Sequence, residues 1–174
     1  MIGLENKTLR SKRLTYRLLE PADKQALRQI VSDESVAEPA GFLAPDTQEK
    51  FDGFFAALTR HNTAIAILDG ETLTGYIHVY PYTDELPDRP GKRGVSTGFV
   101  IGRKSWNRGY ATETLQTVTA YLLRTFDFCI ADHFVGNEAS RRVIEKCGYR
   151  YFETYTMPFE ALGREMTCHS YIRE

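Results

Sequence analysis

The chain has 174 residues and a formal net charge of −1 at pH 7, which fits one domain over residues 1–174 with a sizeable core. This charge balance argues against a general nucleic-acid binder, because neutralising phosphates requires an excess of Lys and Arg. No apolar run reaches membrane-spanning length and the N-terminus is polar and charged. We therefore expect a cytoplasmic protein without a signal peptide and without membrane contact.

Cysteine usage supports the same compartment. Cys129, Cys147 and Cys168 are odd in number and widely spaced, and they lie in apolar periodic segments. The chain contains no CxxC pair and no Cys/His zinc spacing. We expect three core thiols and no metal site.

The first half of the chain alternates strands and helices. Residues 14–19 are predicted to form a strand, and Pro21 begins a helix that reaches about Val31. Residues 37–45 are predicted to be a loop, after which Asp46 or Thr47 caps a helix to about residue 58. Residues 64–68 and 72–80 form a predicted hairpin around the turn signal Asp69-Gly70.

The second half continues the alternation. Residues 81–94 are rich in Pro, Gly and charge and indicate a mobile surface loop. A strand–loop–helix unit then precedes a strand over about 128–135, a helix from Glu138, and two strands over 149–157 and 165–172. Apart from the strand–helix–strand crossover, all neighbours can pair antiparallel.

Residues 98–113 (GFVIGRKSWNRGYATE) carry the strongest functional signal. An apolar strand runs into a basic loop and then into a helix with an apolar face. A helix N-terminus has unpaired N–H groups and a partial positive charge, and Gly109 and Ala111 let a ligand approach the backbone. The segment therefore predicts a cradle for a phosphate group.

A nucleotide-triphosphate loop is a poor fit to this segment. Residues 98–105 nearly match G-x-x-x-x-G-K-S, but Arg103 stands at the second glycine, where a Cβ obstructs the required turn. A junction that binds nothing is the plain alternative.

Two linked motifs carry a resemblance to a known family. W-N-R-G-Y-A-T-E at 106–113 resembles the acetyl-coenzyme A pyrophosphate loop of the GNAT superfamily of N-acetyltransferases, and Trp106 is typical of its ribosomal-protein N-terminal acetyltransferase branch. N-E-A-S-R-R-V-I-E-K-C-G-Y at 137–149 is similar to a helix of that branch, and residues 9–17 are similar to its opening strand. The resemblance implies an α/β (α+β) GNAT fold: about four helices and a mostly antiparallel sheet of about seven strands with one parallel, splayed pair.

The resemblance also implies how acetyl-coenzyme A (acetyl-CoA), the acyl donor, is held. Its pantetheine arm would pair with the strand backbone in the splayed gap, and its pyrophosphate would receive the N–H groups that follow. The residues implied are Phe99, Val100 and Ile101 for the arm, and Arg108, Gly109, Tyr110, Ala111 and Thr112 for the pyrophosphate. Arg108 could add charge and the Thr112 hydroxyl one more donor.

Asn137 and Ser140 each have two interpretations. Asn137 can simply cap the helix that begins at Glu138, with Ser140 in its first turn. The resemblance implies instead that the Asn137 side chain meets the pantetheine amides and that the Ser140 hydroxyl lies near the thioester sulfur. Both are therefore candidate catalytic residues.

Two positions depart from the family pattern. Ile144 stands where many members carry a tyrosine, and Ser96 stands where the branch usually has a glutamate acting as a base through water. Glu153, Asp132 or His133 could serve as the base instead. Without a strong base, a low-pKa α-amine (about 14% neutral at pH 7) is an easier substrate than lysine (about 0.04% neutral).

The acceptor is less constrained than the donor. Phe42 and the 37–45 loop, the 81–94 loop, and the last hairpin with Tyr151, Glu153 and Tyr155 are candidate acceptor regions. The sequence thus predicts an N-acetyltransferase, monomeric or homodimeric, acting on a small-molecule amine or a peptide N-terminus. A non-catalytic acyl-CoA-binding module is the alternative.

Overall fold

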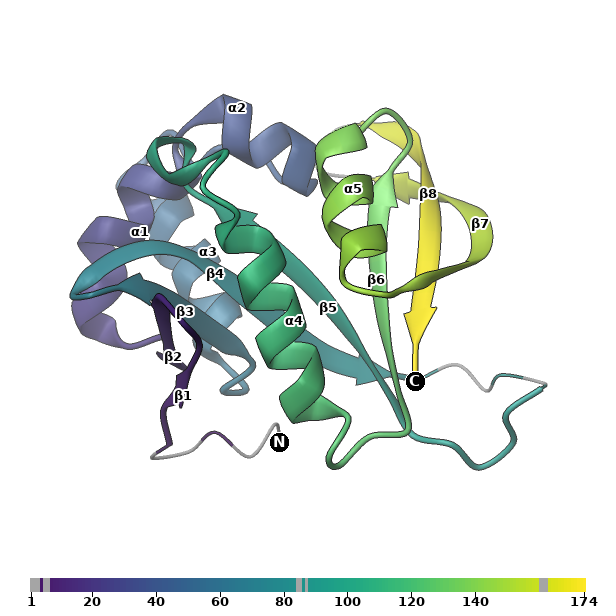
Figure 1. Ribbon diagram of the computed structural model, residues 1–174. Helices are drawn as coiled ribbons and strands as arrows, with labels where there is room; N and C mark the ends of the chain where they lie inside the picture. Colours follow the sequence, from purple (N-terminus) through teal and green to yellow (C-terminus); the bar gives the residue numbers. More distant parts are fainter. Residues whose placement is uncertain (1–3, 5–6, 84–85, 87, 160–162) are drawn as a thin grey trace.

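In the computed structural model, a single central sheet organises the chain, and the structure describes residues 4, 7–83, 86, 88–159 and 163–174. Eight strands form this sheet in the order β1-β2-β3-β4-β5-β6-β8-β7 among the described residues. Every neighbouring pair is antiparallel except β5 with β6, which is parallel (Figure 1). The predicted fold class, a mostly antiparallel sheet with one parallel pair, is confirmed.

The strands follow the predicted positions closely. Their bounds are β1 Leu9–Arg10, β2 Leu14–Leu18, β3 Ala64–Asp69, β4 Thr72–Tyr82, β5 Gly94–Ile101, β6 Phe128–Phe134, β7 Arg150–Phe159 and β8 Arg164–Arg173. Gly70, in the β3–β4 turn, has a φ of 60°, which explains the strength of the Asp-Gly signal there.

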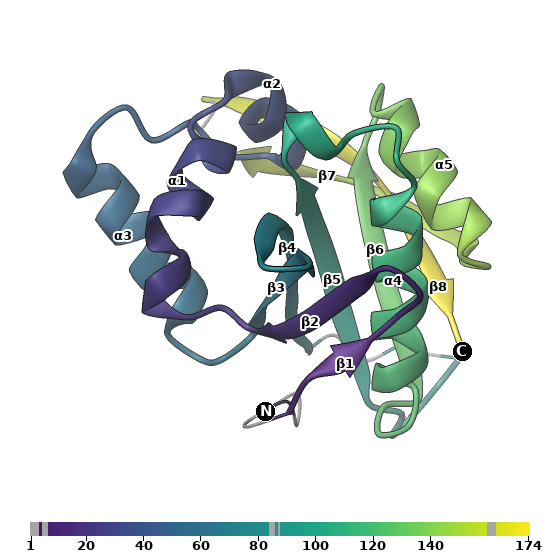
Figure 2. The same cartoon turned by 60° about the vertical axis from the view of Figure 1, so that its left-hand side comes forward.

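Helices cover both faces of the sheet. Their bounds are α1 Lys24–Val31, α2 Glu34–Ala37, α3 Gln48–Thr59, α4 Tyr110–Leu122 and α5 Glu138–Lys146, with short 3-10 turns η1 Pro21–Asp23, η2 Glu38–Ala40 and η3 Arg103–Ser105. α1 and α3 lie on one face, and α4 and α5 lie on the other (Figures 1 and 2). The predicted cap of α3 is confirmed, since the Thr47 hydroxyl accepts from the Lys50 N–H at 3.2 Å.

The core is divided in two by the sheet. Ile65 and Ile67 of β3 pack with Leu115 and Val118 of α4, whereas Ala66, between them, packs with the α1–α3 cluster. β3 is therefore buried on both sides, which explains its continuous apolar sequence.

Two segments differ from the expected loops. The 37–45 loop contains the end of α2 and all of η2, because Asp33 caps a short helix by accepting from the Ser35 N–H at 3.0 Å. β1, which is two residues long, and α2 account for the strand and the helix beyond the expected numbers. The 81–94 segment is shorter than expected, since β4 extends to Tyr82 and β5 begins at Gly94.

The 81–94 segment also has a buried anchor. Leu86 is 6% exposed and packs with Phe128, Ile130 and Ile172, so part of this segment belongs to the core. Residues 84, 85 and 87 of the predicted loop lie outside the described residues.

Candidate active site

The parallel strands β5 and β6 separate along their length. They pair only from Gly94 with Phe128 to Thr97 with Ala131. Past that point β5 still pairs with β4 as far as Ile101, and β6 still pairs with β8 as far as Phe134. The sheet therefore opens between β5 and β6, and two cavities border the opening.

The register of β4 with β5 decides which backbone groups face the opening. Antiparallel pairs alternate between hydrogen-bonded and non-bonded, and the Gly102 N–H donates to the Thr74 carbonyl at 2.8 Å. Val100, two residues earlier, therefore has its backbone polar groups directed to Tyr76 of β4. Phe99 and Ile101 direct theirs toward the opening.

This register corrects one sequence-based expectation. One of the three residues expected to pair with a pantetheine arm is Val100. It lines both of the cavities that border the opening, but its backbone N–H and carbonyl are paired with β4. The Ile101 carbonyl is also occupied, because the Trp106 indole N–H donates to it at 2.7 Å. The backbone of Phe99 and the N–H of Ile101 are the groups that the register leaves facing the opening.

The first cavity lies at the N-terminus of α4, and we call it the donor cavity because most residues expected to hold the acyl donor line it. Its volume is about 560 Å³. Its walls include the following residues expected from the sequence: Phe99, Val100, Ile101, Gly109, Tyr110, Ala111, Thr112, Asn137 and Ser140. Of the residues expected to hold the donor, only Arg108 is absent from these walls.

The α4 N-terminus has the properties of an anion site. Gly109 is the N-cap residue with a φ of 77°, and no side chain caps the helix. Asn107, two residues before Gly109, also has a positive φ, of 59°. The first N–H groups of a 13-residue helix are therefore left without a side-chain cap where the helix meets the donor cavity.

Residues of the turn between β1 and β2 hold the start of α4 in place. Glu113, in the first turn of α4, accepts from the Ser11 hydroxyl at 2.7 Å and from the Arg13 N–H and Nε at 2.8 and 2.7 Å. The Arg13 guanidinium also donates to the Arg108 carbonyl at 2.8 Å and lies over the Tyr110 ring. We call this set, Ser11, Arg13 and Glu113, the loop brace; it gives the 9–17 motif a structural role.

The Arg108 side chain is directed elsewhere. Its guanidinium lies 5.3 Å from the centre of the Tyr110 ring and 4.0 Å from an Asp69 carboxylate oxygen. The Tyr110 hydroxyl also donates to Asp69, at 2.5 Å. Arg108 thus takes part in fixing the turn, and its expected extra charge for the phosphate is shared with Asp69.

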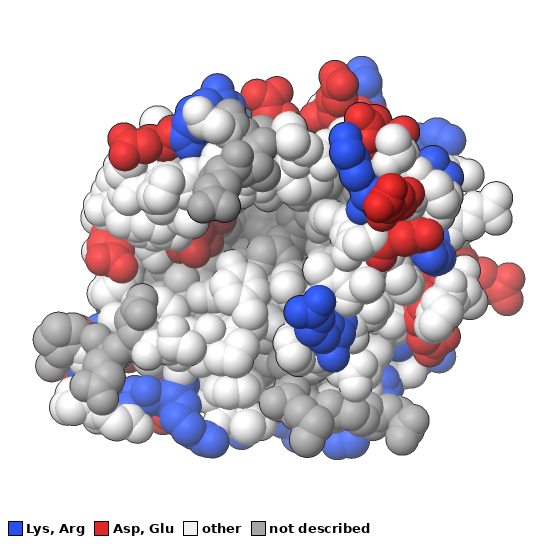
Figure 3. Space-filling view, turned by 180° about the vertical axis from the view of Figure 1, so that it is seen from behind, with Lys and Arg blue, Asp and Glu red and all other residues white. Residues whose placement is uncertain are grey.

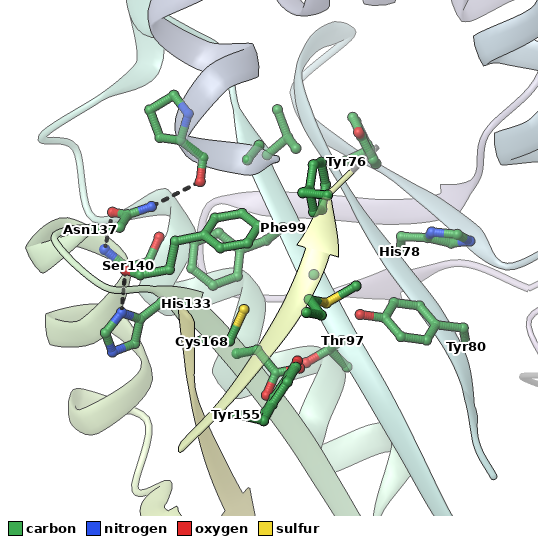
Figure 4. Close-up of a pocket in the computed structure, with 18 residues that line it drawn as sticks. Tyr76, His78, Tyr80, Thr97, Phe99, His133, Asn137, Ser140, Tyr155 and Cys168 are labelled. Atoms are coloured by element: carbon green, nitrogen blue, oxygen red, sulfur yellow. Dashed lines mark hydrogen bonds between the residues drawn. The ribbon is translucent and has the colours of Figure 1, made fainter. Parts of the chain in front are cut away.

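Asn137 is a helix cap, the first of the two interpretations that the sequence left open. Its side-chain oxygen accepts from the Ser140 N–H at 3.1 Å, which is a helix cap. Its amide nitrogen donates to the Pro39 carbonyl at 3.1 Å and ties α5 to η2 (Figure 4). Both Asn137 and Ser140 also line both cavities.

The second cavity has a volume of about 330 Å³, and we call it the acceptor cavity because Tyr155, from an expected acceptor region, lines it. Its lining residues come from β4, β5, β6, β7, β8, η2 and the N-terminal end of α5. Tyr76, His78 and Tyr80 reach it from β4, and the Tyr80 hydroxyl points into it (Figure 4). The space-filling view from behind shows a hollowed face with charged side chains of both signs mainly toward its rim (Figure 3).

The two cavities share one wall. Pro39, Ala40, Phe99, Val100, Asn137 and Ser140 line both of them. This wall lies where β5 and β6 separate, at the N-terminus of α5.

One candidate base stands out in the acceptor cavity. Asp132 lines it, and one carboxylate oxygen of Asp132 is buried without a hydrogen-bond partner among the described residues. Burial raises the pKa of Asp132, and hydrogen bonds from Ser170 and Tyr155 offset only part of that rise. Such a carboxylate is a better proton acceptor than an exposed one.

The other candidate bases are less well placed. Glu153 is exposed on β7 and lies outside both cavities. His133 lines the acceptor cavity, but its Nδ1 is 2.9 Å from the Phe134 carbonyl and its ring packs on His169 and Tyr171. Asp132 is therefore the candidate that the cavity favours.

The two departures from the family pattern are core positions here. Ser96 is 5% exposed and Ile144 is 0% exposed. Neither lines the two cavities described above.

Of the expected acceptor regions, only part reaches the acceptor cavity. Tyr155 lines it, whereas Tyr151 does not. Phe42 packs against Phe54, with ring centres 5.0 Å apart, and does not line the cavity. Pro39 and Ala40 are the residues of the 37–45 loop that line it. The sequence reasoning missed the β4 residues, although Tyr76, His78 and Tyr80 alternate along one strand face, which is the signal that could have identified them.

Other features of the site are negative or structural. Among the described residues, no three His, Cys, Asp or Glu side chains are grouped to hold a metal ion. Within the same residues, no helix is long and apolar enough to cross a membrane. The three cysteines are free and buried, as expected for core thiols.

Comparisons with known proteins agree with this geometry. The family model of the acetyltransferase (GNAT) domain matches residues 13–150. The uncharacterized N-acetyltransferase YnaD of Bacillus subtilis is 27% identical over 144 residues, which cover 80% of this chain and 81% of YnaD.

Solved structures share the fold. A GNAT-family acetyltransferase from Bacillus anthracis superposes with a TM-score of 0.79 at 23% identity, covering 95% of this chain and 97% of that one. A Vibrio cholerae protein assigned as a ribosomal-protein-serine acetyltransferase gives 0.75 at 15% identity, covering 95% and 96%. The chain belongs to the GNAT family of acetyltransferases.

Proposed function

We propose that this enzyme moves the acetyl group of acetyl-CoA to a primary amine by direct attack in a ternary complex. The observation that carries the proposal is the wall shared by the donor and acceptor cavities. A thioester at that wall is accessible to an amine from the other side, so both reactants can be bound at once.

The donor cavity suits the parts of acetyl-CoA. The pyrophosphate fits the uncapped N–H groups at Gly109, Tyr110, Ala111 and Thr112, with the turn at Arg108. The pantetheine amides fit the backbone of Phe99 and the N–H of Ile101. Asn137 has its side chain engaged in capping, so we assign it mainly to holding the shared wall.

Ser140 is the side chain of α5 best suited to assist the departing thiolate. It lines both cavities, and its backbone N–H donates to the Asn137 side chain. Ile144, which stands where many family members carry a tyrosine, is buried and has no group that could donate in place of Ser140. A serine hydroxyl can donate a hydrogen bond to the developing negative charge on sulfur.

The acceptor is a small-molecule amine or a protein N-terminal α-amine. The motifs at 106–113 and 137–149 favour the ribosomal-protein N-terminal branch, and the fold likeness to the Vibrio cholerae protein is compatible with it. A low-pKa amine presents more of its neutral, reactive form at pH 7.

The test is coenzyme A release from acetyl-CoA against a panel of amines, together with equilibrium binding of acetyl-CoA. Binding with turnover on at least one amine supports the proposal. Tight binding with no turnover on any amine supports the non-catalytic module, and failure to bind acetyl-CoA contradicts both.

Ser140→Ala sharpens the test. We expect kcat to fall about tenfold or more, while the Kd for acetyl-CoA stays within about threefold, because the hydroxyl acts mainly on the developing thiolate. Ser32→Ala is the control, since that hydroxyl bonds to the Pro45 carbonyl and lines neither cavity. An unchanged kcat removes Ser140 from the mechanism.

A further inference from the structure

We propose that the acceptor is a primary amine carried on a small apolar group, and that Asp132 binds its ammonium and then accepts its proton. This inference rests on the proposed acetyl transfer and specifies the substrate class of the acceptor cavity. Three features of the acceptor cavity support it: the side chains that line the cavity, the charge of those side chains, and an oxygen of Asp132 that has no hydrogen-bond partner among the described residues.

The acceptor cavity is largely aromatic. The tyrosines and phenylalanines that line it are Tyr76, Tyr80, Phe99, Phe134, Tyr155 and Phe159. Aromatic faces bind apolar groups by burial and attract a cation through the ring quadrupole. The volume of about 330 Å³ is at the low end of small-molecule sites, so the occupant is small.

The cavity has one carboxylate, two histidines (His78 and His133) and no Lys or Arg. Asp132 is the only Asp or Glu among its lining residues. Burial lowers the pKa of His78, so this ring is neutral at pH 7. The charge therefore matches one ammonium group, whereas a polyamine would leave its other ammonium groups unpaired.

The hydroxyls beside Asp132 are neutral donors. Burial, together with the charge of Asp132, raises the pKa of Tyr80 to about 12 and also raises the pKa of Tyr155. The second carboxylate oxygen of Asp132 has no partner among the described residues. A buried carboxylate oxygen without a partner is costly, and a substrate ammonium would satisfy it when the Asp132 side chain turns toward the cavity that it lines.

The proton balance is complete with this one base. The ammonium transfers one proton to the Asp132 carboxylate, and the neutral nitrogen attacks the thioester carbonyl. The C–N bond forms, the C–S bond breaks, and the second proton of the nitrogen passes to the leaving thiolate, assisted by Ser140. The products are the amide and coenzyme A thiol, and Asp132 returns its proton to water.

The pH dependence follows from the state that Asp132 needs. The groups that act on its charge are Glu153 and His133, beside the hydrogen bonds from Ser170 and Tyr155. The carboxylate must be ionised to bind the ammonium, so kcat/KM should fall as pH drops through its raised pKa.

The experiment compares 2-phenylethylamine with spermidine and with a short peptide that has a free N-terminus. We expect kcat/KM for 2-phenylethylamine to exceed the other two by about tenfold or more. Asp132→Asn should lower kcat/KM for 2-phenylethylamine by about a hundredfold or more and abolish the acid limb of the pH profile. Its Kd for acetyl-CoA should stay within about threefold of the parent value.

Glu165→Gln is the matched control, because it removes an exposed carboxylate from β8 outside both cavities. It should change kcat/KM by no more than about twofold. Should Asp132→Asn not fold, a competition experiment on the parent enzyme replaces it. The inhibition constant of 2-phenylethanol, which lacks the ammonium, should be at least about tenfold higher than the dissociation constant of 2-phenylethylamine.

The outcomes separate this inference from the proposed function. Preference for spermidine or for the peptide overturns the substrate class but leaves acetyl transfer standing. Asp132→Asn with full activity, or equal binding of the alcohol and the amine, overturns the role of Asp132. Acetyl-CoA binding without turnover on any amine overturns the proposed function itself.

Discussion

The donor and acceptor cavities meet at one wall but are built in different ways. The donor cavity presents backbone: the edge of β5 and the uncapped N-terminus of α4, fixed by the loop brace. The acceptor cavity presents side chains from five strands, from η2 and from the N-terminal end of α5, between Pro39 and Cys168 in the chain.

This difference separates what the family shares from what this enzyme recognises. Backbone groups bind pyrophosphate and pantetheine whatever the neighbouring side chains are, so the same donor can be held by diverged sequences. An acceptor cavity made of side chains changes its substrate with each substitution. Changes on the donor side should therefore alter acetyl-CoA affinity, and changes on the acceptor side should alter amine kinetics.

Gly109→Val should have the largest effect on the donor side. A β-branched residue at a φ of 77° is strained by about 1–2 kcal/mol, and relieving that strain moves the N–H groups at the α4 N-terminus. We expect acetyl-CoA affinity to fall about tenfold to a hundredfold by isothermal titration calorimetry.

Gly91→Val is the matched control, since Gly91 has a φ of 74° in open surroundings away from both cavities. It should lose similar stability and retain acetyl-CoA affinity. If both variants bind acetyl-CoA equally well, the α4 N-terminus does not hold the pyrophosphate.

Glu113→Gln should have an intermediate effect, again on the donor side. Burial raises the pKa of Glu113, but hydrogen bonds from Ser11 and Arg13 outweigh burial, so the net pKa is lowered. We expect about 1–2 kcal/mol less stability at pH 7 and acetyl-CoA affinity reduced about threefold to tenfold. The KM for the amine should not change.

The pH dependence of this loss follows from the sign of the shift. A lowered folded-state pKa contributes stability that is present above the unfolded-state pKa and lost as pH falls through the folded-state value. The stability difference between parent and Glu113→Gln, measured by urea unfolding, should therefore shrink in acid. Arg10→Ala is the control and should change neither quantity, because within the described part of the chain its guanidinium donates only to the Thr15 hydroxyl, at 3.5 Å. A difference that does not depend on pH would contradict the ionised brace.

Gly98→Ala should have the smallest effect, and on the acceptor side alone. Gly98 lines the acceptor cavity, and a Cβ there meets no atom within 4 Å. The added methyl group should raise amine KM about twofold to fivefold while stability rises by about 0.5 kcal/mol.

Gly53→Ala on the exposed face of α3 is its control: it should gain stability by about 0.5–1 kcal/mol and leave the kinetics unchanged. Steady-state kinetics with both substrates checks the pair. A change in acetyl-CoA KM on Gly98→Ala would show that the two cavities are not independent.

Local patterns made most of the elements and the turn before α4 predictable. The hairpin at Asp69-Gly70, the cap at Thr47 and the turn at Gly109 all depend on residues close in sequence. The elements that were missed, β1 and α2, are too short for a hydrophobic period to reveal them.

Side-chain partners across the sheet were less predictable. Phe42 was expected near the acceptor but packs on Phe54, and Tyr76 was not expected there but lines the cavity. Apolar periodicity indicates that a residue is buried, and it does not indicate which neighbour buries it.

The sequence by itself determined the order of the elements, the family and the glycine turn before α4, because these follow from residues adjacent in the chain. Only the tertiary structure decided that Phe99 and Ile101, and not Val100, present their backbone to the opening, since that depends on the register with β4. Only the tertiary structure, likewise, brought Asp132 together with Tyr80 and Tyr155. Residues distant in the chain meet through strand pairing and packing, which no local pattern encodes.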